Sequence, residues 1–238
     1  MGGESASAKV IDQAAAARLL GWWLDSGVDV AVSETPRDWR RAAPAAPVTA
    51  NVSASPSTEA PTDLAAFHSW LDSAPDLPLA RAGAKRVLPV GAERAPLMLL
   101  ADFPSAQDSA ANRPIGGEAW ALAQRMLAAI GIESEAAYVA TLACFNAPGA
   151  KLAGDELKRC GQIARDHVRL AKPERLLLFG DAPARALTGH PLASARGRVH
   201  RVEGVRTVAT FHPRWLLQRP SDKALAWKDL LLLMSEEG

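Results

Sequence analysis

Cysteine, tyrosine and long apolar runs are scarce in this chain of 238 residues, which has two cysteines and one tyrosine. Two cysteines in so long a chain exclude the disulfide framework that stabilises small secreted domains. The longest apolar runs, such as residues 97–101 and 230–234, fall well short of the roughly 18 residues that a membrane-spanning helix needs. We therefore expect neither a disulfide scaffold nor a membrane partner.

An excess of charge of one sign is also missing, because 27 Lys and Arg residues face 26 Asp and Glu residues. A net charge of +1 by itself argues against a nucleic-acid partner. The charge is unevenly distributed, however, and residues 172–228 alone carry +7. Ordinary salt screens interactions beyond about 10 Å, so a local cationic segment can attract a polyanion in a neutral protein. A solvated basic surface is the alternative.

The first residues do not resemble a targeting segment. Residues 1–9 have neither a basic start followed by an apolar run nor a small-residue cleavage site. We therefore expect a cytoplasmic protein, in which both thiols stay reduced. The hydrophobic content of 48% is sufficient for a sizeable core.

The chain divides into three parts by composition. Residues 1–35 are predicted to form an N-terminal helical segment, because an apolar stripe runs along residues 10–24. Residues 36–61 contain five prolines and seven alanines without a periodic apolar pattern, which is typical of a linker. The folded domain is predicted at residues 62–238, beginning with a helix that Asp63 caps.

Within the predicted domain, short apolar runs alternate with helical patterns. The predicted strands are residues 97–101, 138–142, 175–179 and 205–211, and the main predicted helices are residues 117–130, 154–170, 182–187 and 223–234. This alternation predicts an α/β fold, a three-layer α/β/α sandwich around a mostly parallel four-stranded sheet. Ligands of such sheets bind beyond the carboxyl ends of the strands, so functional side chains are expected there.

The most informative strand end is the last one. His212 stands where an imidazole can donate a hydrogen bond to a developing negative charge, and Pro213 stiffens the chain after it. The residues that follow combine cations suited to phosphates with apolar groups suited to wedging into a base stack. These predicted DNA contacts are Arg214, Trp215, Leu216, Arg219 and Lys223. The alternative is a structural histidine beside a hydrophobic loop tucked into the core.

These residues resemble a known family. The pattern His-Pro-x-x-Leu-Leu at 212–217, with Lys-x-x-x-Trp-x-Asp-Leu at 223–230, is similar to the C-terminal signature of bacterial and archaeal uracil-DNA glycosylases of the iron–sulfur type, family 4-like. Three further stretches match that family in order and spacing, namely residues 97–117, 138–160 and 172–182. The resemblance covers most of residues 62–235 and implies a glycosylase fold.

For catalysis, the resemblance implies a reduced set of residues. The glutamate that assists water attack in the family corresponds to Asp102, and the histidine that stabilises the departing uracil corresponds to His212. Ile115 replaces a stacking phenylalanine and offers no π face, while Thr141 lacks the paired donor and acceptor of an asparagine. The residues corresponding to the base pocket are Ala101, Phe103, Pro104, Ser105, Ile115 and Thr141, of which Pro104 is unchanged.

The cofactor of the family is expected to be lost. Four thiolates hold such an iron–sulfur cluster, and Cys144 and Cys160 resemble half of that ligand set. Ala74 and Leu77 stand at the other two positions, so we predict no cofactor and no metal. The two cysteines are expected to be buried reduced thiols, the alternatives being a labile disulfide or a stray metal site. The other histidines lack metal-ligand spacing and are expected to be structural or on the surface: His68, His167, His190 and His200.

We therefore expect a DNA glycosylase-like monomer whose partner is single-stranded or damaged duplex DNA. It would flip a nucleotide into a pocket between Asp102 and His212 and hydrolyse the N-glycosidic bond of uracil or a related damaged base. Slow turnover or an altered base preference is expected from the changed pocket. The alternative is a catalytically impaired DNA-binding or regulatory module with the same fold, and a third hypothesis is a glycosylase for another damaged base.

Overall fold

The computed structural model describes residues 61–80, 84–146, 152 and 154–235. The predicted N-terminal helical segment, and the predicted linker up to residue 60, lie outside these residues. At the centre is a five-stranded sheet in the order β2-β1-β3-β5-β4. Its strands are β1 (Met98–Ala101), β2 (Tyr138–Thr141), β3 (Arg175–Phe179), β4 (His200–Val202) and β5 (Val205–Thr210). The pairs β1–β2, β1–β3 and β3–β5 are parallel, and β4 runs antiparallel to β5.

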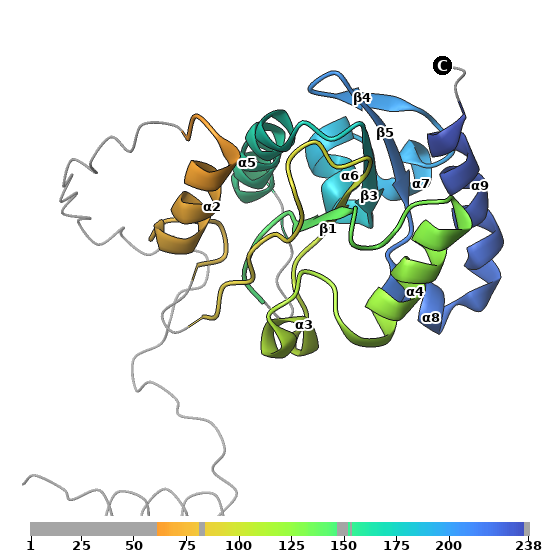
Figure 1. The fold of residues 1–238 in the computed structure, drawn as a ribbon, viewed down its shortest axis with the longest axis horizontal. Helices are drawn as coiled ribbons and strands as arrows, with labels where there is room; N and C mark the ends of the chain where they lie inside the picture. The colour runs from red at the N-terminus through yellow and green to blue at the C-terminus, as the bar shows by residue number, and fades with distance from the viewer. Residues whose placement is uncertain (1–60, 81–83, 147–151, 153, 236–238) are drawn as a thin grey trace, which may run out of the picture. The chain divides into compact units, whose positions relative to one another are not determined.

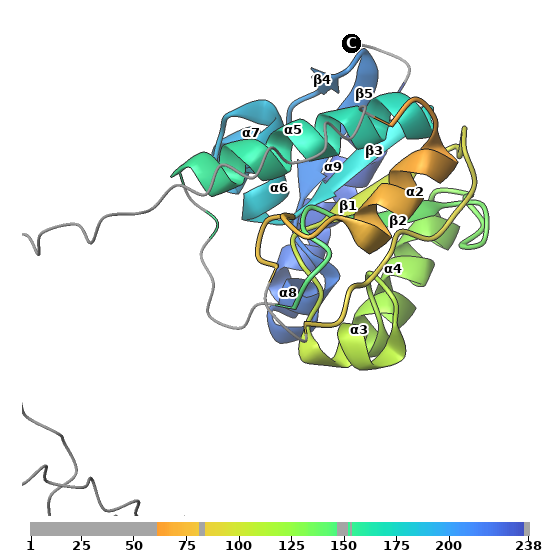
Figure 2. The same cartoon turned by 90° about the vertical axis from the view of Figure 1, so that its left-hand side faces the viewer.

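Helices cover both faces of this sheet. They are α2 (Leu64–Ser73), α3 (Ala106–Ala111), α4 (Gly117–Ala129), α5 (Gly154–Ala171), α6 (Asp181–Thr188), α7 (Leu192–Ala195), α8 (Pro213–Gln218) and α9 (Lys223–Met234), with a 3₁₀ turn η1 (Pro220–Asp222) before α9. Figures 1 and 2 show α5 and α6 on one side of the sheet and α4 and α9 on the other. The predicted three-layer α/β/α class is therefore confirmed.

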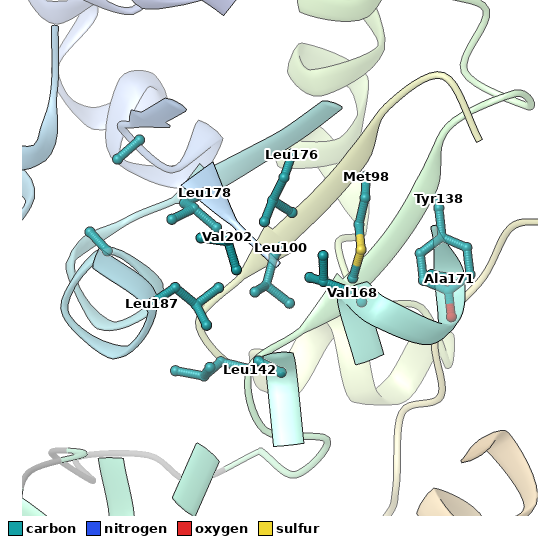
Figure 3. Packing of buried hydrophobic residues seen from close by; sticks show 14 of the residues in the cluster. Met98, Leu100, Tyr138, Leu142, Val168, Ala171, Leu176, Leu178, Leu187 and Val202 are labelled. Carbon is teal, nitrogen blue, oxygen red and sulfur yellow. The ribbon is translucent and has the colours of Figure 1, made fainter. Parts of the chain in front are cut away.

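Strand β1 is apolar throughout, and β3 is apolar after Arg175, because both faces of these strands are buried. Met98 and Leu100 of β1 point toward α5 and α6, where they join the cluster of side chains drawn in Figure 3. Leu97 and Leu99 point the other way, into a second cluster with α4 and α9. Each face of the sheet thus has its own core. None of the helices in the described part of the chain is long and apolar enough to cross a membrane.

The expectation of four strands was wrong in number, because β4 adds a fifth. This strand has only three residues and includes a charged arginine, so no apolar run marks it in the sequence. It pairs with β5 through a two-residue turn at Glu203 and Gly204, whose φ angles are 49° and 81°. Positive φ at both central residues is what a type I′ hairpin requires. An antiparallel edge strand on a parallel sheet follows directly from such a tight turn.

The segment after His212, expected as a loop, forms the short helix α8. His212 is its N-cap, and the imidazole accepts a hydrogen bond from the backbone N–H of Arg214. Pro213 occupies the first helical position, where its missing N–H leaves no donor unsatisfied. The sequence HPRWLLQ is therefore a helix start, and this places the following side chains on distinct helix faces.

Candidate active site

The two predicted catalytic residues meet at the carboxyl edge of the sheet. Asp102 directly follows β1 and His212 follows β5, and these strands flank β3 in the parallel part of the sheet. The imidazole Nε2 of His212 lies 3.9 Å from Oδ1 of Asp102. Both residues line a pocket of about 670 Å³, to which Asp181 after β3 and Leu192 of α7 also contribute. The strand ends thus bring together side chains that lie 110 positions apart in the sequence.

His212 is held as a neutral imidazole with a defined tautomer. Its exposed fraction is 7%, and burial lowers its pKa to about 3, assisted by the nearby Arg214 cation. Because Nδ1 accepts the backbone N–H of Arg214 at 3.0 Å, the proton of the neutral ring lies on Nε2. Nη2 of Arg214 approaches Nε2 to 3.2 Å, and since both atoms carry hydrogen in this tautomer, that contact is no hydrogen bond. His212 can therefore donate through Nε2.

Asp102 is a carboxylate in a poorly solvated position. Burial raises its pKa above the usual value, and the Arg214 guanidinium beside it opposes this rise without cancelling it. Nη2 of Arg214 donates to Oδ1 of Asp102 over 3.1 Å. A carboxylate with a raised pKa is a better proton acceptor at neutral pH than an exposed one. Asp102 can therefore orient or activate a water molecule.

Arg214 joins the loop after β1 to helix α8. Besides Asp102, its guanidinium donates to Asp108 at 3.1 Å and to the carbonyl oxygen of Phe103 at 3.2 Å. Asp108 is buried, and its carboxylate also accepts from the backbone N–H groups of Ser105 and Gly116. Arg214 was predicted from the sequence as a DNA contact, and in the structure its charge faces two carboxylates within the protein.

The predicted base-pocket residues at the end of β1 and directly after it contribute mainly to the packing and capping of the fold. Ala101 and Pro104 are buried, and Ser105 caps α3, where its hydroxyl accepts from the N–H of Asp108. Phe103 packs against the core cluster on the side of α5 and α6. The side chain of Phe103 therefore does not fill the space between Asp102 and His212.

The structure does not bring Ile115 and Thr141 to the pocket of Asp102 and His212. Ile115 is 2% exposed and lines a separate cavity of about 390 Å³ with Trp120 and Arg113. Thr141 lines a void of about 20 Å³ on the side of Cys144. The base-pocket residues taken from the resemblance thus fall into different places of this fold.

The predicted DNA contacts after Arg214 separate by helix face. Trp215 is 40% exposed, and Arg219 and Lys223 are exposed as well. Leu216, predicted as a wedge, is 1% exposed and packs between α4 and α9 instead. The helical geometry of α8 explains this division, because neighbouring positions on a helix point to different sides.

Two further pocket residues were missed by the sequence analysis. Phe211 stands directly before His212, and its ring lies nearly parallel to that of Trp215, with centroids 6.4 Å apart and 11° between the planes. Arg196 stacks over Phe211 with its guanidinium carbon 4.4 Å from the ring centroid. Phe211 could have been found from the sequence, because it directly precedes the candidate catalytic His212. Arg196 comes from after α7 and carries no sequence pattern that connects it with the pocket.

The region of the two cysteines does not fit an iron–sulfur cluster. Cys144 and Cys160 are buried free thiols, and burial raises their pKa values to about 11 and about 12. Ala74 and Leu77 are buried in one apolar cluster with Cys144, beside the void of about 20 Å³, which has room for about one water molecule. Within the described residues, no group of three or more His, Cys, Asp or Glu side chains is arranged to hold a metal.

Comparison with known proteins agrees with this architecture. The profile of the Uracil DNA glycosylase superfamily matches residues 88–231, more than half of the chain. The type-4 uracil-DNA glycosylase of Pyrobaculum aerophilum is 23% identical over 181 residues, which cover 71% of this chain and 92% of that protein. The type-4 uracil-DNA glycosylase of Archaeoglobus fulgidus is 25% identical over 142 residues, covering 55% of this chain and 71% of that protein. With a strand-end pocket between Asp102 and His212 and a match over most of its folded part, this chain belongs to the uracil DNA glycosylase superfamily.

Proposed function

We propose that this protein is a DNA glycosylase that binds single-stranded or damaged DNA and hydrolyses the N-glycosidic bond of an extruded uracil or related damaged base. The observation that supports this proposal most directly is the convergence of Asp102 and His212, with 3.9 Å between Oδ1 and Nε2, in a pocket of about 670 Å³. Flipping a nucleotide costs a few kcal/mol, and contacts in the pocket offset that cost.

Asp102 and His212 take complementary roles in this reaction. The C1′–N bond of the nucleotide breaks and its electron pair leaves with the base, so the sugar passes through a cationic state. A water oxygen then bonds to C1′ and its proton passes to the carboxylate of Asp102, whose pKa is raised by burial. The Nε2–H of neutral His212 stabilises the negative charge that develops on the departing base.

The contacts of Arg214 support a second candidate function, a catalytically impaired DNA-binding module. The guanidinium occupies Oδ1 of Asp102 and holds the carboxylate in an internal ion pair. Ile115 and Thr141 also do not line this pocket. A protein of this kind would keep salt-dependent DNA affinity without excision.

An excision assay on uracil-containing single strands and duplexes decides between these functions. We expect base release, reduced about 10²- to 10⁴-fold in rate by Asp102→Asn and about 10²- to 10³-fold by His212→Ala. Asp155→Asn, an exposed carboxylate on α5, is the matched control and should retain the rate. The hydrolase would be refuted if DNA with uracil and DNA with each of a panel of other lesions stay intact and neither variant has an effect. The binding module would then remain.

The pH profile of Arg214→Gln tests how Asp102 works. The Arg214 cation lowers the pKa of Asp102 against the larger effect of burial, so its removal should raise that pKa further. Excision needs the ionised carboxylate, and the acid limb of kcat/KM should therefore move to higher pH. An unchanged acid limb in a folded variant would mean that a group other than Asp102 controls the rate.

A further inference from the structure

One side of the pocket is lined by Arg196, Phe211 and Trp215, and the exposed Arg219 stacks on Trp215 beside it. We call these four side chains the arginine–aromatic wall. The rings of Phe211 and Trp215 are nearly parallel. A guanidinium stacks on each ring, with Arg196 at 4.4 Å from the centroid of Phe211 and Arg219 at 4.8 Å from that of Trp215. Two nearly parallel rings, each with a guanidinium stacked on it, thus lie together beside the pocket.

The members of the arginine–aromatic wall are held in place by buried or local partners. Asp229 is 1% exposed and binds the guanidinium of Arg196 at 2.7 Å, while it also accepts from the hydroxyl of Thr210 at 2.8 Å. The indole Nε1 of Trp215 donates to Asp222 over 2.8 Å. These contacts fix both side chains before any ligand arrives, which reduces the entropy lost on binding.

The wall is open to a ligand and continuous with the candidate catalytic residues. Trp215 is 40% exposed, and Phe211, Trp215 and Arg196 line the same pocket as Asp102 and His212. Aromatic rings and guanidinium planes accept the face of any nucleobase, because every base has a π surface. Arginines at such sites also attract the phosphate backbone. The segment that supplies all four residues carries the +7 charge excess of the chain.

We propose that the arginine–aromatic wall is a stacking platform for bases of single-stranded DNA that neighbour the nucleotide in the pocket. The proposal deepens the proposed function and rests on it, since it takes DNA as the ligand of this pocket. Single strands are favoured because the faces of bases in a duplex are already covered by their neighbours. The platform has no preference for one base, since it makes stacking contacts and reads no base edge.

Fluorescence anisotropy with three labelled probes tests the platform on the full chain. The probes are a 12-nucleotide thymidine strand, a strand of equal length built from abasic spacers, and the corresponding duplex. We expect the thymidine strand to bind at least about fivefold more tightly than either other probe, since base–aromatic stacking contributes that much or more. Trp215→Leu keeps an apolar side chain without a large π face and should remove most of the difference. Trp227→Leu is the matched control, because Trp227 is 42% exposed on α9 and lies outside the wall.

Each outcome is decisive for the platform. Equal affinity of the wild type for thymidine and abasic strands, or equal losses in Trp215→Leu and Trp227→Leu, would overturn it, as would a lack of DNA binding. A thermal melt of each variant shows that the fold is retained, and Phe211→Leu provides a second change inside the wall with the same expected loss. Base-dependent binding without excision would support the platform and refute the hydrolase. Excision without base-dependent binding would support the hydrolase and refute the platform.

Discussion

At the scale of single residues, the environment separates histidines that look alike in the sequence. His212 and His167 are both buried and neutral, and burial lowers the pKa of each to about 3. His212 faces the pocket, whereas His167 belongs to a chain of hydrogen bonds. In this chain, Oη of Tyr138 lies 2.7 Å from Nε2 of His167 and 2.6 Å from Nε2 of His68. The tyrosine hydroxyl can donate to one imidazole and accept from the other. This network joins α2, β2 and α5.

The burial of His167 predicts a loss of stability in acid. Its pKa falls from 6.5 to about 3 on folding, so between these values the unfolded chain binds a proton that the folded chain does not. The free energy of unfolding should therefore decrease as the pH falls below about 6.5, by up to about 1.4 kcal/mol per pH unit for each such histidine. His167→Gln, which can still accept from Tyr138, should reduce this slope in urea titrations at several pH values. The exposed His190→Gln should not, and equal slopes in both variants would contradict the assignment.

At the scale of elements, close approach of two helices depends on a missing side chain. Gly161 of α5 lies against α6, and a Cβ atom at this position would meet the carbonyl oxygen of Ala186 at 2.8 Å. Backbone atoms cannot move aside as a flexible side chain can. The sequence places Gly161 inside a strongly helical segment, where glycine lowers intrinsic helix stability. The close approach of α6 explains why a glycine stands at this position despite its low helix propensity.

Gly161→Ala tests which of two opposing effects is larger. Helix propensity alone would stabilise the protein by about 1 kcal/mol, whereas overpacking against a neighbouring backbone costs about 1–3 kcal/mol. Because the contact involves backbone, we expect the clash to prevail and the free energy of unfolding to fall by about 1–2 kcal/mol in urea denaturation. Gln162→Ala, an exposed neighbour in the same helix, should change it by less than about 0.5 kcal/mol. A stabilised Gly161→Ala protein would show that α5 and α6 can separate without cost.

At the scale of the whole molecule, the surroundings of Cys144 are packed with apolar side chains. Phe67, Leu71, Ala74 and Leu77 form an apolar cluster with Cys144 and Phe145. Arg86 fastens the end of α2 to this region, donating to the carbonyl oxygens of Leu71 and Ala74 at 2.6 and 2.7 Å. Its guanidinium also lies 5.2 Å from the centroid of the Phe145 ring. These contacts hold α2 against the segment that follows β2.

The purified protein should therefore be colourless and free of iron. The full chain has only two cysteines, both buried thiols whose pKa values are raised, so no set of four thiolates is available to hold an iron–sulfur cluster. Visible absorption and iron analysis measure this directly, and a strong chelator should leave the melting temperature unchanged. A brown sample with broad visible absorption, or a melting temperature that falls with chelation, would overturn the prediction.

Much of the fold could be predicted from the sequence because strands that are buried on both faces of the sheet appear as short apolar runs. Residues 175–179 and 223–234 match the observed β3 and α9, and the other predicted strands differ from the observed ones by one residue at an end. The edge strand β4 escaped detection, since it is short, half exposed and charged. Asp102 and His212 could be placed together from the sequence because parallel strands end at a common edge.

The sequence by itself determined the α/β class and the strand ends that carry Asp102 and His212, since these follow from local patterns. The tertiary structure decided which way side chains face. It turned Leu216 into the core and left Trp215 exposed, set Arg214 against Asp102 and Asp108, and brought Arg196 onto Phe211. Such contacts join segments far apart in the chain, and their geometry depends on how helices pack on the sheet, which no local pattern encodes.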